Sequence, residues 1–364
     1  MSKMIAGIIG AGGISNYHIQ GYLKAGVDVR AVVDPDRKRA ESQAQKYNIP
    51  EVFSELKTML EKIPEITLAS ICTPNKFHAE TALRLLASGK NVFCEKPPAL
   101  SLKETLKMKE AARKSGRVLM FDFNNRARPE ARAMMQYIKN GDVGRINSAQ
   151  AVWVRRAGIP GFGSWFTRKS LSGGGPLIDL LHMLDLTLYF MGFPEPEWVL
   201  AQTFRDFNDD RAFKGPWGIP DVKGGAMDVE TSAQAFIRFK SGQVVFCRNS
   251  WAEMNRREEV SVTFQGTRAG GLLRRLFGRD GIDETAIDDC ELYTVENGRQ
   301  VNRKVIVEPD EKMGRETAVV NFVNTVSGRE KPLSTPSEAV ILMGIIEAVY
   351  QSAEKGGPVR MKKT

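Results

Sequence analysis

The feature that most constrains the fold is a regular alternation, across residues 4–123, of short apolar runs with amphipathic segments. The apolar runs are four to seven residues long and rich in Val, Ile and Phe, as expected of strands buried on both faces. The predicted strands are Ile5–Ile9, Val29–Val33, Ile66–Cys72, Asn91–Cys94 and Val118–Phe123. The predicted helices are Ile14–Ala25, Pro35–Tyr47, Glu55–Ile63, Phe77–Ser88 and Leu102–Ser115. This alternation predicts an α/β fold with a doubly wound parallel sheet.

The pattern changes after about residue 125, which predicts a domain of residues 1–124 and a second domain of residues 125–364. A helix over Pro129–Lys139 is followed by longer, alternating runs typical of a mostly antiparallel sheet. These strands are predicted at Ser148–Arg155, Trp198–Phe204, Ser232–Phe239, Val244–Trp251 and Val260–Phe264. We expect long loops at Gly215–Gly225 and Gly266–Glu284 and a last helix at about 337–352.

The composition argues against a nucleic-acid-binding protein, a membrane protein and a secreted protein. The 364 residues have a formal charge of +9, but the basic residues are dispersed, so we expect solvated surface charge and no nucleic-acid partner. No apolar run reaches the roughly 18 residues of a membrane helix, and the N-terminus does not resemble a signal peptide. Four cysteines without metal-type spacing predict reduced, structural thiols. We therefore expect a cytoplasmic protein with no membrane contact.

A glycine cluster, Gly10-Ala-Gly12-Gly13, directly follows the first predicted strand and opens the first predicted helix. Glycines there allow a tight turn and let the backbone approach a pyrophosphate. Asp34 ends the second predicted strand, where a carboxylate accepts from ribose hydroxyls and repels a 2′-phosphate. The pattern predicts NAD binding, with NADP less favoured although Arg37 and Lys38 lie close by.

Two further polar segments follow the fourth and fifth predicted strands. Thr73-Pro74-Asn75 with His78 ends the fourth, and Lys96 ends the fifth. Parallel strands bring their carboxyl ends to one edge of the sheet, where open α/β sheets bind ligands. Because two prolines follow Lys96, its backbone is restricted, and the lysine is expected to point at the cofactor.

The segment Gly173-Gly-Gly-Pro-Leu-Ile-Asp179-Leu-Leu-His182-Met-Leu-Asp185 predicts a chain break and then an apolar helix with three polar residues on one side. A histidine beside carboxylates can take and return a proton near neutral pH, although a histidine satisfied within the core is the alternative. With too few ligands for a metal, we expect none. Trp165 is a candidate for stacking on a sugar ring, or plain packing.

These motifs resemble the glucose–fructose oxidoreductase, inositol dehydrogenase and rhizopine-catabolism family, written Gfo/Idh/MocA. The resemblance rests on the glycine turn, Asp34, "TPNKFH", "EKP", "GGGPLIDLLHMLD", "SWA" and "AVYQSAEKGGPV", which span nearly the whole chain. It implies a Rossmann domain, then an α/β domain whose open sheet forms dimers or tetramers. It also implies that Lys96 contacts the reacting hydroxyl, that His182 is the acid/base and that Asp179 contacts sugar hydroxyls. The family spaces that aspartate four residues before the histidine, whereas Asp179 stands three before His182 and Ile178 occupies the usual position.

The resulting hypothesis is a dehydrogenase that moves a hydride between NAD and a secondary hydroxyl of a sugar, glycoside or cyclic polyol bound between the two domains. One alternative is a glycosidase or lyase that recycles a held NAD through a transient keto-sugar. Another is a non-catalytic NAD-binding regulator. The predicted catalytic residues are Lys96, His182 and Asp179, and the predicted substrate-binding residues add Trp165. The predicted cofactor-binding residues are Gly10, Gly12, Gly13, Ile14, Asp34, Arg37, Thr73, Pro74, Asn75, His78, Glu95 and Lys96.

Overall fold

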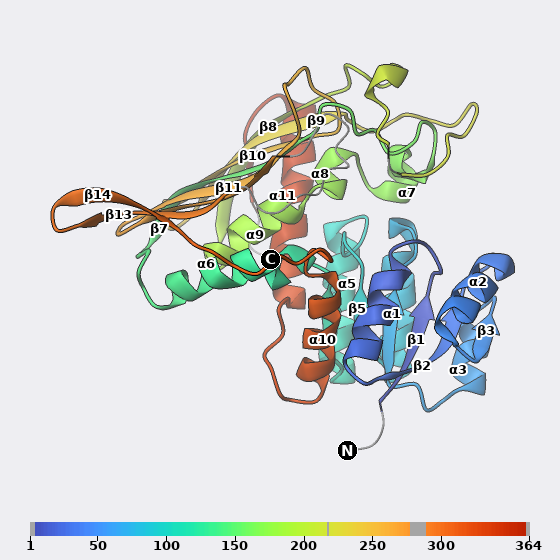
Figure 1. Ribbon diagram of the computed structural model, residues 1–364. Helices are drawn as coiled ribbons and strands as arrows, with labels where there is room; N and C mark the ends of the chain where they lie inside the picture. Colours follow the sequence, from blue (N-terminus) through green and yellow to red (C-terminus); the bar gives the residue numbers. More distant parts are fainter. Residues whose placement is uncertain (1–3, 217, 277–288, 362–364) are drawn as a thin grey trace. The chain divides into compact units, whose positions relative to one another are not determined.

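The structure is a computed structural model that describes residues 4–216, 218–276 and 289–361 (Figure 1). It divides into two compact units. The first comprises residues 1–127 and 312–340, and the second comprises residues 128–311 and 341–364.

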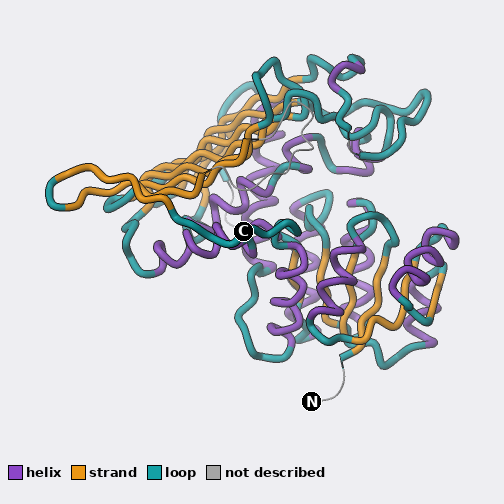
Figure 2. Tube along the Cα trace, in the orientation of Figure 1, coloured by secondary structure: helices purple, strands orange, loops and turns teal. Residues whose placement is uncertain are grey.

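The first unit is built on a six-stranded parallel sheet with the strand order β3-β2-β1-β4-β5-β6. Helices and strands alternate along it, as Figure 2 shows by colour, which confirms the predicted doubly wound α/β fold. Its strands are β1 (Ile5–Ile9), β2 (Asp28–Val33), β3 (Glu51–Phe53), β4 (Leu68–Ile71), β5 (Asn91–Cys94) and β6 (Leu119–Phe121). Its helices are α1 (Ser15–Lys24), α2 (Arg37–Tyr47), α3 (Leu56–Lys62), α4 (His78–Ala87), α5 (Leu102–Ser115) and α10 (Arg315–Val326).

The helix α10 returns to the first unit from far along the sequence. It packs against α1, and a shared buried cluster joins both helices to α2 and the strands. At the contact, a Cβ added to Gly21 would lie 2.6 Å from the Cβ of Val319, so glycine is what permits this close approach. Beyond α10, the Ser334 hydroxyl accepts the backbone N–H of Phe121 and donates to its carbonyl oxygen, both at 2.9 Å. The segment 312–340 is thus bonded to the edge of the parallel sheet.

The second unit is built on a nine-stranded sheet with the order β14-β13-β12-β11-β7-β10-β9-β8-β15. Only the β7–β10 pair is parallel among its described neighbours, so the predicted mostly antiparallel sheet is confirmed. Its strands are β7 (Ile146–Val154), β8 (Pro196–Phe204), β9 (Ser232–Phe239), β10 (Val244–Ser250), β11 (Glu259–Gly266), β12 (Gly270–Leu276), β13 (Asp289–Glu296), β14 (Arg299–Lys304) and β15 (Val359–Arg360). Its helices are α6 (Pro129–Lys139), α7 (Lys169–Ser172), α8 (Pro176–Asp179) and α9 (His182–Phe190), and α11 (Pro336–Lys355) begins in the first unit and ends in the second.

The predicted loop at Gly266–Glu284 is wrong over its first half, because β12 occupies Gly270–Leu276. The two glycines that suggested a loop have a packing role inside the strand. A Cβ added to Gly271 would lie 2.3 Å from the ring of Phe264 on the neighbouring strand β11. The end of the predicted loop, residues 277–284, lies outside the described residues.

Four buried cysteines carry free thiols, in agreement with the predicted structural role. Among the described residues, none of the helices combines the length and apolar character needed to cross a membrane.

Candidate active site

The glycine turn after β1 has the geometry that the sequence predicts for a phosphate-binding turn. Gly10 has φ +96°, and a Cβ there would lie 2.5 Å from the carbonyl oxygen of Cys72, so no other residue fits without displacing the chain. At Gly12 and Gly13, by contrast, an added Cβ would meet nothing within 4 Å. The backbone is therefore open where α1 begins, and Ile14 packs partly against the core cluster below. This open cradle at a helix N-terminus fits the pyrophosphate of a dinucleotide.

Asp34 connects the end of β2 to that turn. One carboxylate oxygen accepts the backbone N–H of Ala11 at 2.8 Å, and the other accepts the N–H of Asp36 at 2.9 Å. Of the basic residues that follow, Arg37 pairs with Glu41 and is mostly exposed, while Arg39 comes within 3.9 Å of the Asp34 carboxylate. The arginine nearest the expected ribose position is thus Arg39, which the sequence analysis did not single out.

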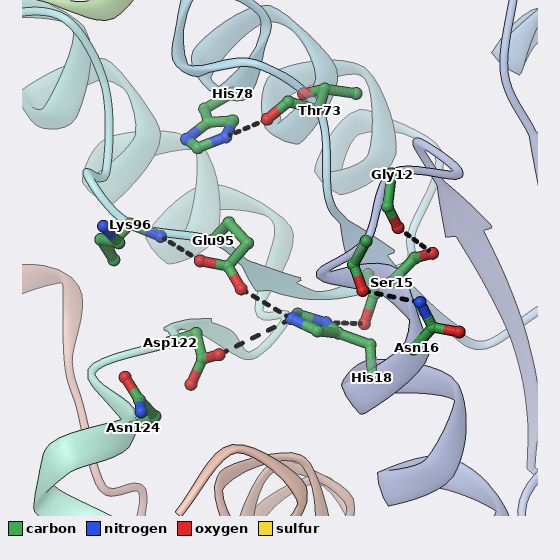
Figure 3. A network of polar contacts seen from close by, with 12 residues as sticks. Gly12, Ser15, Asn16, His18, Thr73, His78, Glu95, Lys96, Asp122 and Asn124 are labelled. Carbon is green, nitrogen blue, oxygen red and sulfur yellow. Dashed lines mark hydrogen bonds and ion pairs between the residues drawn. The ribbon is translucent and has the colours of Figure 1, made fainter. Parts of the chain in front are cut away.

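The loops after β4 and β5 are held together by His78, the first residue of α4. One ring nitrogen lies 2.7 Å from the carbonyl oxygen of Pro97. The other lies 2.9 Å from that of Thr73 (Figure 3). Burial lowers the pKa of His78, so the ring is neutral and donates to one carbonyl at a time. Thr73, Pro74 and Asn75 thus lie at the same sheet edge as Lys96, as the parallel arrangement predicts.

Glu95 points into the first unit and meets a residue that sequence analysis missed. Its carboxylate accepts the Lys96 backbone N–H at 3.1 Å and lies 3.0 Å from a ring nitrogen of His18, on α1 (Figure 3). Asp122, just after β6, lies 3.6 Å from the same nitrogen. These three side chains turn potential ligand atoms toward one another within 4.8 Å, but the direct hydrogen bond between His18 and Glu95 already occupies them. The absence of a metal stays a prediction.

In the second unit, the glycine run before α8 is required by packing. A Cβ on Gly174 would lie 1.9 Å from the hydroxyl oxygen of Tyr350, and one on Gly175 would lie 2.2 Å from the carbonyl oxygen of Glu230. The buried carboxylate of Glu230 accepts the N–H groups of Gly175 and Leu177 and the Tyr350 hydroxyl. The start of the short helix α8 is therefore fixed by one carboxylate.

The continuous helix expected through Asp179, His182 and Asp185 is broken. The helix α8 ends at Asp179, and α9 begins at His182. The side-chain amide of Asn249, on β10, donates to the carbonyl oxygen of Leu180 at 3.0 Å and to that of Pro176 at 3.4 Å. A buried donor thus satisfies carbonyl groups at the break. His182 and Asp185 lie in the first turn of α9, whereas Asp179 lies on the other side of the break.

Asp179 belongs to a cluster of tryptophan, arginine and carboxylate side chains. Its carboxylate accepts the ring N–H of Trp251 at 2.9 Å and lies 3.5 Å from a guanidinium nitrogen of Arg155. Arg155 also pairs with Glu258 at 3.1 Å, which in turn accepts the ring N–H of Trp153 at 2.8 Å.

His182 lies beside this cluster, since its ring stands 5.8 Å from that of Trp153. Trp165 is half-buried and stacks on Phe166 at 3.8 Å. Glu258, Trp153 and Trp251 are cluster members that sequence reasoning missed. Only the "SWA" motif, which contains Trp251, gave a signal for one of them.

Comparison with known proteins identifies the architecture. A model of the oxidoreductase family with an NAD-binding Rossmann fold matches residues 4–123, and a model of that family's C-terminal α/β domain matches residues 135–361. The chain belongs to the Gfo/Idh/MocA oxidoreductase family. A D-glucoside 3-dehydrogenase of Escherichia coli (strain K12) is 32% identical over 368 residues, which cover 99% of this chain and 98% of that protein. A myo-inositol 2-dehydrogenase of Thermotoga maritima is 24% identical, with 99% of both chains covered.

Among solved structures, a levoglucosan dehydrogenase in complex with NADH superposes with a TM-score of 0.84 at 21% identity, covering both chains fully. This similarity shows a shared fold. As a Gfo/Idh/MocA member, the protein is an NAD-binding oxidoreductase, and its open glycine turn and the Asp34 carboxylate are the residues that fit the cofactor.

Proposed function

We propose that this Gfo/Idh/MocA protein is a dehydrogenase that oxidises a secondary hydroxyl of a sugar, glycoside or cyclic polyol with NAD. The observation that carries the proposal is the placement of Lys96 at the carboxyl end of β5, on the same sheet edge as the open glycine turn. A cation at that edge stabilises the alkoxide that develops as a hydroxyl loses its proton. The similarity to the D-glucoside 3-dehydrogenase over nearly the whole chain supports a carbohydrate substrate.

The proposal gives each residue a separate task. His182, in the first turn of α9 and beside Trp153, takes the hydroxyl proton as the general base. Asp179, whose carboxylate is oriented by Trp251 and Arg155, accepts hydrogen bonds from sugar hydroxyls. When bound, the nicotinamide supplies the redox chemistry by accepting the hydride. Asp34 and the glycine turn hold its nucleotide portion.

A substrate panel tests the proposal. Purified protein is given NAD or NADP and a series of sugars, methyl glycosides and inositols, and nicotinamide reduction is followed by absorbance. We expect steady reduction with one sugar class, a preference for NAD, and loss of turnover in Lys96→Ala with NAD binding retained. Turnover that survives in Lys96→Ala contradicts the assigned role. Product without net reduction points instead to internal NAD recycling, and NAD binding without any turnover points to a regulator.

We further propose that the protein acts in the cytoplasm as a homo-oligomer. The four free thiols are compatible with a reducing compartment. On the nine-stranded sheet, Leu200 and Phe246 are 45% and 53% exposed, and the Phe246 ring packs at 4.8 Å on that of Phe236. Exposed apolar side chains gathered on a sheet face are typical of an interface. Light scattering should show an oligomer that dissociates in Phe246→Glu but not in Ile306→Glu, since Ile306 is an exposed apolar residue outside the sheet. A monomeric wild-type protein would contradict this.

A further inference from the structure

His18 is a completely buried titratable group near the proposed cofactor edge, and the proposed function does not use it. The side chain is fully buried and lies on α1, in the first turn of the helix that begins at Ser15. It is surrounded by groups from every element packed against it. These groups are Tyr22 on α1, Ser70 on β4, Cys72 after β4, Phe93 and Glu95 on or after β5, and Asp122 after β6.

Each ring nitrogen of His18 faces an oxygen atom that can accept a hydrogen bond. Nε2 faces the carboxylate of Glu95 at 3.0 Å and that of Asp122 at 3.6 Å. Nδ1 lies 3.0 Å from the hydroxyl oxygen of Ser70, which itself donates to the Tyr22 hydroxyl at 2.9 Å. His78 also has an acceptor at each nitrogen, but both are uncharged carbonyl groups. His18 instead faces the negative charge of the Glu95 carboxylate, which favours a second proton on the ring and so an imidazolium.

The charges of the neighbours agree with that assignment. Burial alone lowers the pKa of His18, but Cys72, Asp122 and Glu95 together raise it well above its ordinary value. Burial opposes the charge of Glu95, yet the hydrogen bond and charge of His18 bring the pKa of that carboxyl down to about 2. Burial and the Glu95 carboxylate raise the pKa of Asp122 to about 6. The pair of His18 and Glu95 is therefore ionised at neutral pH.

Glu95 links this buried pair to the proposed catalytic lysine. One of its oxygens meets His18, and the other accepts the backbone N–H of Lys96 at 3.1 Å (Figure 3). On the far side of the lysine, His78 holds the carbonyl of Pro97 at 2.7 Å. Hydrogen bonds thus hold the backbone on both sides of Lys96. On the Glu95 side, the series of contacts leads to His18. Removing the imidazole would leave a buried carboxylate without its strongest partner, free to turn away from the Lys96 N–H.

We propose that His18 is a positioning residue for Lys96: its imidazolium fixes the Glu95 carboxylate, which in turn fixes the lysine backbone at the carboxyl end of β5. This proposal deepens the proposed function and rests on the role given there to Lys96. The alternative is a histidine that only fills and stabilises the core. The positioning role and the purely structural role predict different behaviour of the Lys96 backbone when His18 is replaced.

Amide hydrogen exchange at Lys96 tests the positioning step without any turnover. We expect exchange of the Lys96 N–H to become about 10-fold faster in His18→Leu, because its acceptor is no longer held. Tyr22→Phe is the matched control, since it removes a buried hydroxyl from the same network but leaves the His18–Glu95 contact in place. If His18→Leu does not fold, His18→Gln replaces it, which keeps a neutral donor but not the charge. Unchanged Lys96 exchange in a folded His18 variant overturns the proposal, as does an equal acceleration in Tyr22→Phe.

Kinetics on the preferred sugar then test the consequence. A misplaced catalytic group costs about 10²-fold, so kcat should fall by that factor in His18→Leu while the KM for NAD stays close to that of the wild type. His18→Gln should recover part of the loss, and Tyr22→Phe should retain most of kcat. A parallel loss of kcat in Tyr22→Phe would indicate a core residue and overturn the proposal. If the wild type has no activity on any sugar, the proposed function fails, and the exchange experiment still decides whether His18 fixes Lys96.

Discussion

The Asp34 carboxylate is hydrogen-bonded to the glycine turn of the proposed cofactor site. Each of its oxygens accepts one backbone N–H, so the carboxylate is oriented before any ligand arrives. The remaining lone pairs can accept from ribose hydroxyls, while the negative charge repels a 2′-phosphate. Arg39, 3.9 Å away, is the nearest cation to that charge.

Asp34→Ser should therefore shift the cofactor preference. We expect the KM for NAD to rise by about 10- to 100-fold, which is the usual effect of losing a hydrogen bond to a charged group. The KM for NADP should fall. Adding Arg39→Ala to Asp34→Ser should remove the gain for NADP, whereas adding Arg37→Ala should change it less, because it is Arg39 that comes within 3.9 Å of the Asp34 carboxylate. Steady-state kinetics with both cofactors measure this. An unchanged ratio of the two KM values in Asp34→Ser would show that Asp34 serves the fold alone.

His18 gives a pH dependence with a definite sign. Its folded-state pKa lies above the ordinary value of 6.5, so its contribution to stability is fully present below about pH 6.5 and is lost as the pH rises through the raised pKa. Replacing one partner of a buried ion pair costs about 3–5 kcal/mol. His18→Gln should lower the free energy of unfolding by about that much at pH 6 and by much less at pH 10. Urea unfolding of both proteins at the two pH values checks this, and a difference independent of pH would mean that His18 is neutral in the native protein.

The break between α8 and α9 is the main element-scale feature of the second unit. It sets His182 at the start of a helix and separates it from Asp179. Asn249 bonds the carbonyls of Pro176 and Leu180 there, so a strand of the sheet controls where the helix stops. The three-residue spacing between Asp179 and His182 does not place them on one helical face, because no single helix contains both.

Asn249→Asp should disturb this break, since a carboxylate of the same size cannot donate to either carbonyl. A buried acceptor left unsatisfied costs about 1–3 kcal/mol. We expect a loss of stability in that range and a lower kcat, because the start of α9 carries His182. Ser250→Ala is a suitable comparison on the same strand, as Ser250 bonds other segments. Thermal unfolding measures the loss of stability, and steady-state kinetics measure kcat. Wild-type values of both for Asn249→Asp would show that the break does not depend on this amide.

Sequence patterns predicted helices and strands well where residues close together in the sequence determine the ends of the element. The predicted helix Leu102–Ser115 matches α5, where the Ser101 hydroxyl accepts the Glu104 N–H at the start and Gly116 ends the helix with φ +64°. Prediction failed where contacts between residues far apart in the sequence determine the local structure. The glycines of β12 resemble loop residues until the ring of Phe264 fills their space. No motif marks His18, because its partners Ser70, Glu95 and Asp122 are far from it in the sequence and lie on or just after three different strands.

At the scale of the whole molecule, each unit carries a different part of the proposed chemistry. The first contains the glycine turn, Asp34 and the supported Lys96, and the second contains His182 and the cluster around Asp179. The family model of the Rossmann domain lies within the first unit, and the model of the C-terminal domain covers most of the second unit together with residues 312–340 of the first. A dehydrogenase of the proposed kind must move a hydride from a carbohydrate carbon to the cofactor, and the hydride must remain there.

Isotope transfer measures that directly. Purified protein is mixed with NAD and a carbon-deuterated form of the sugar that the panel identifies, and both products are examined by mass spectrometry. We predict one deuterium in the reduced nicotinamide, one fewer in the sugar, and neither change in Lys96→Ala. Deuterium that returns to the sugar product, with no labelled nicotinamide accumulating, would contradict a dehydrogenase and indicate an enzyme that recycles its cofactor.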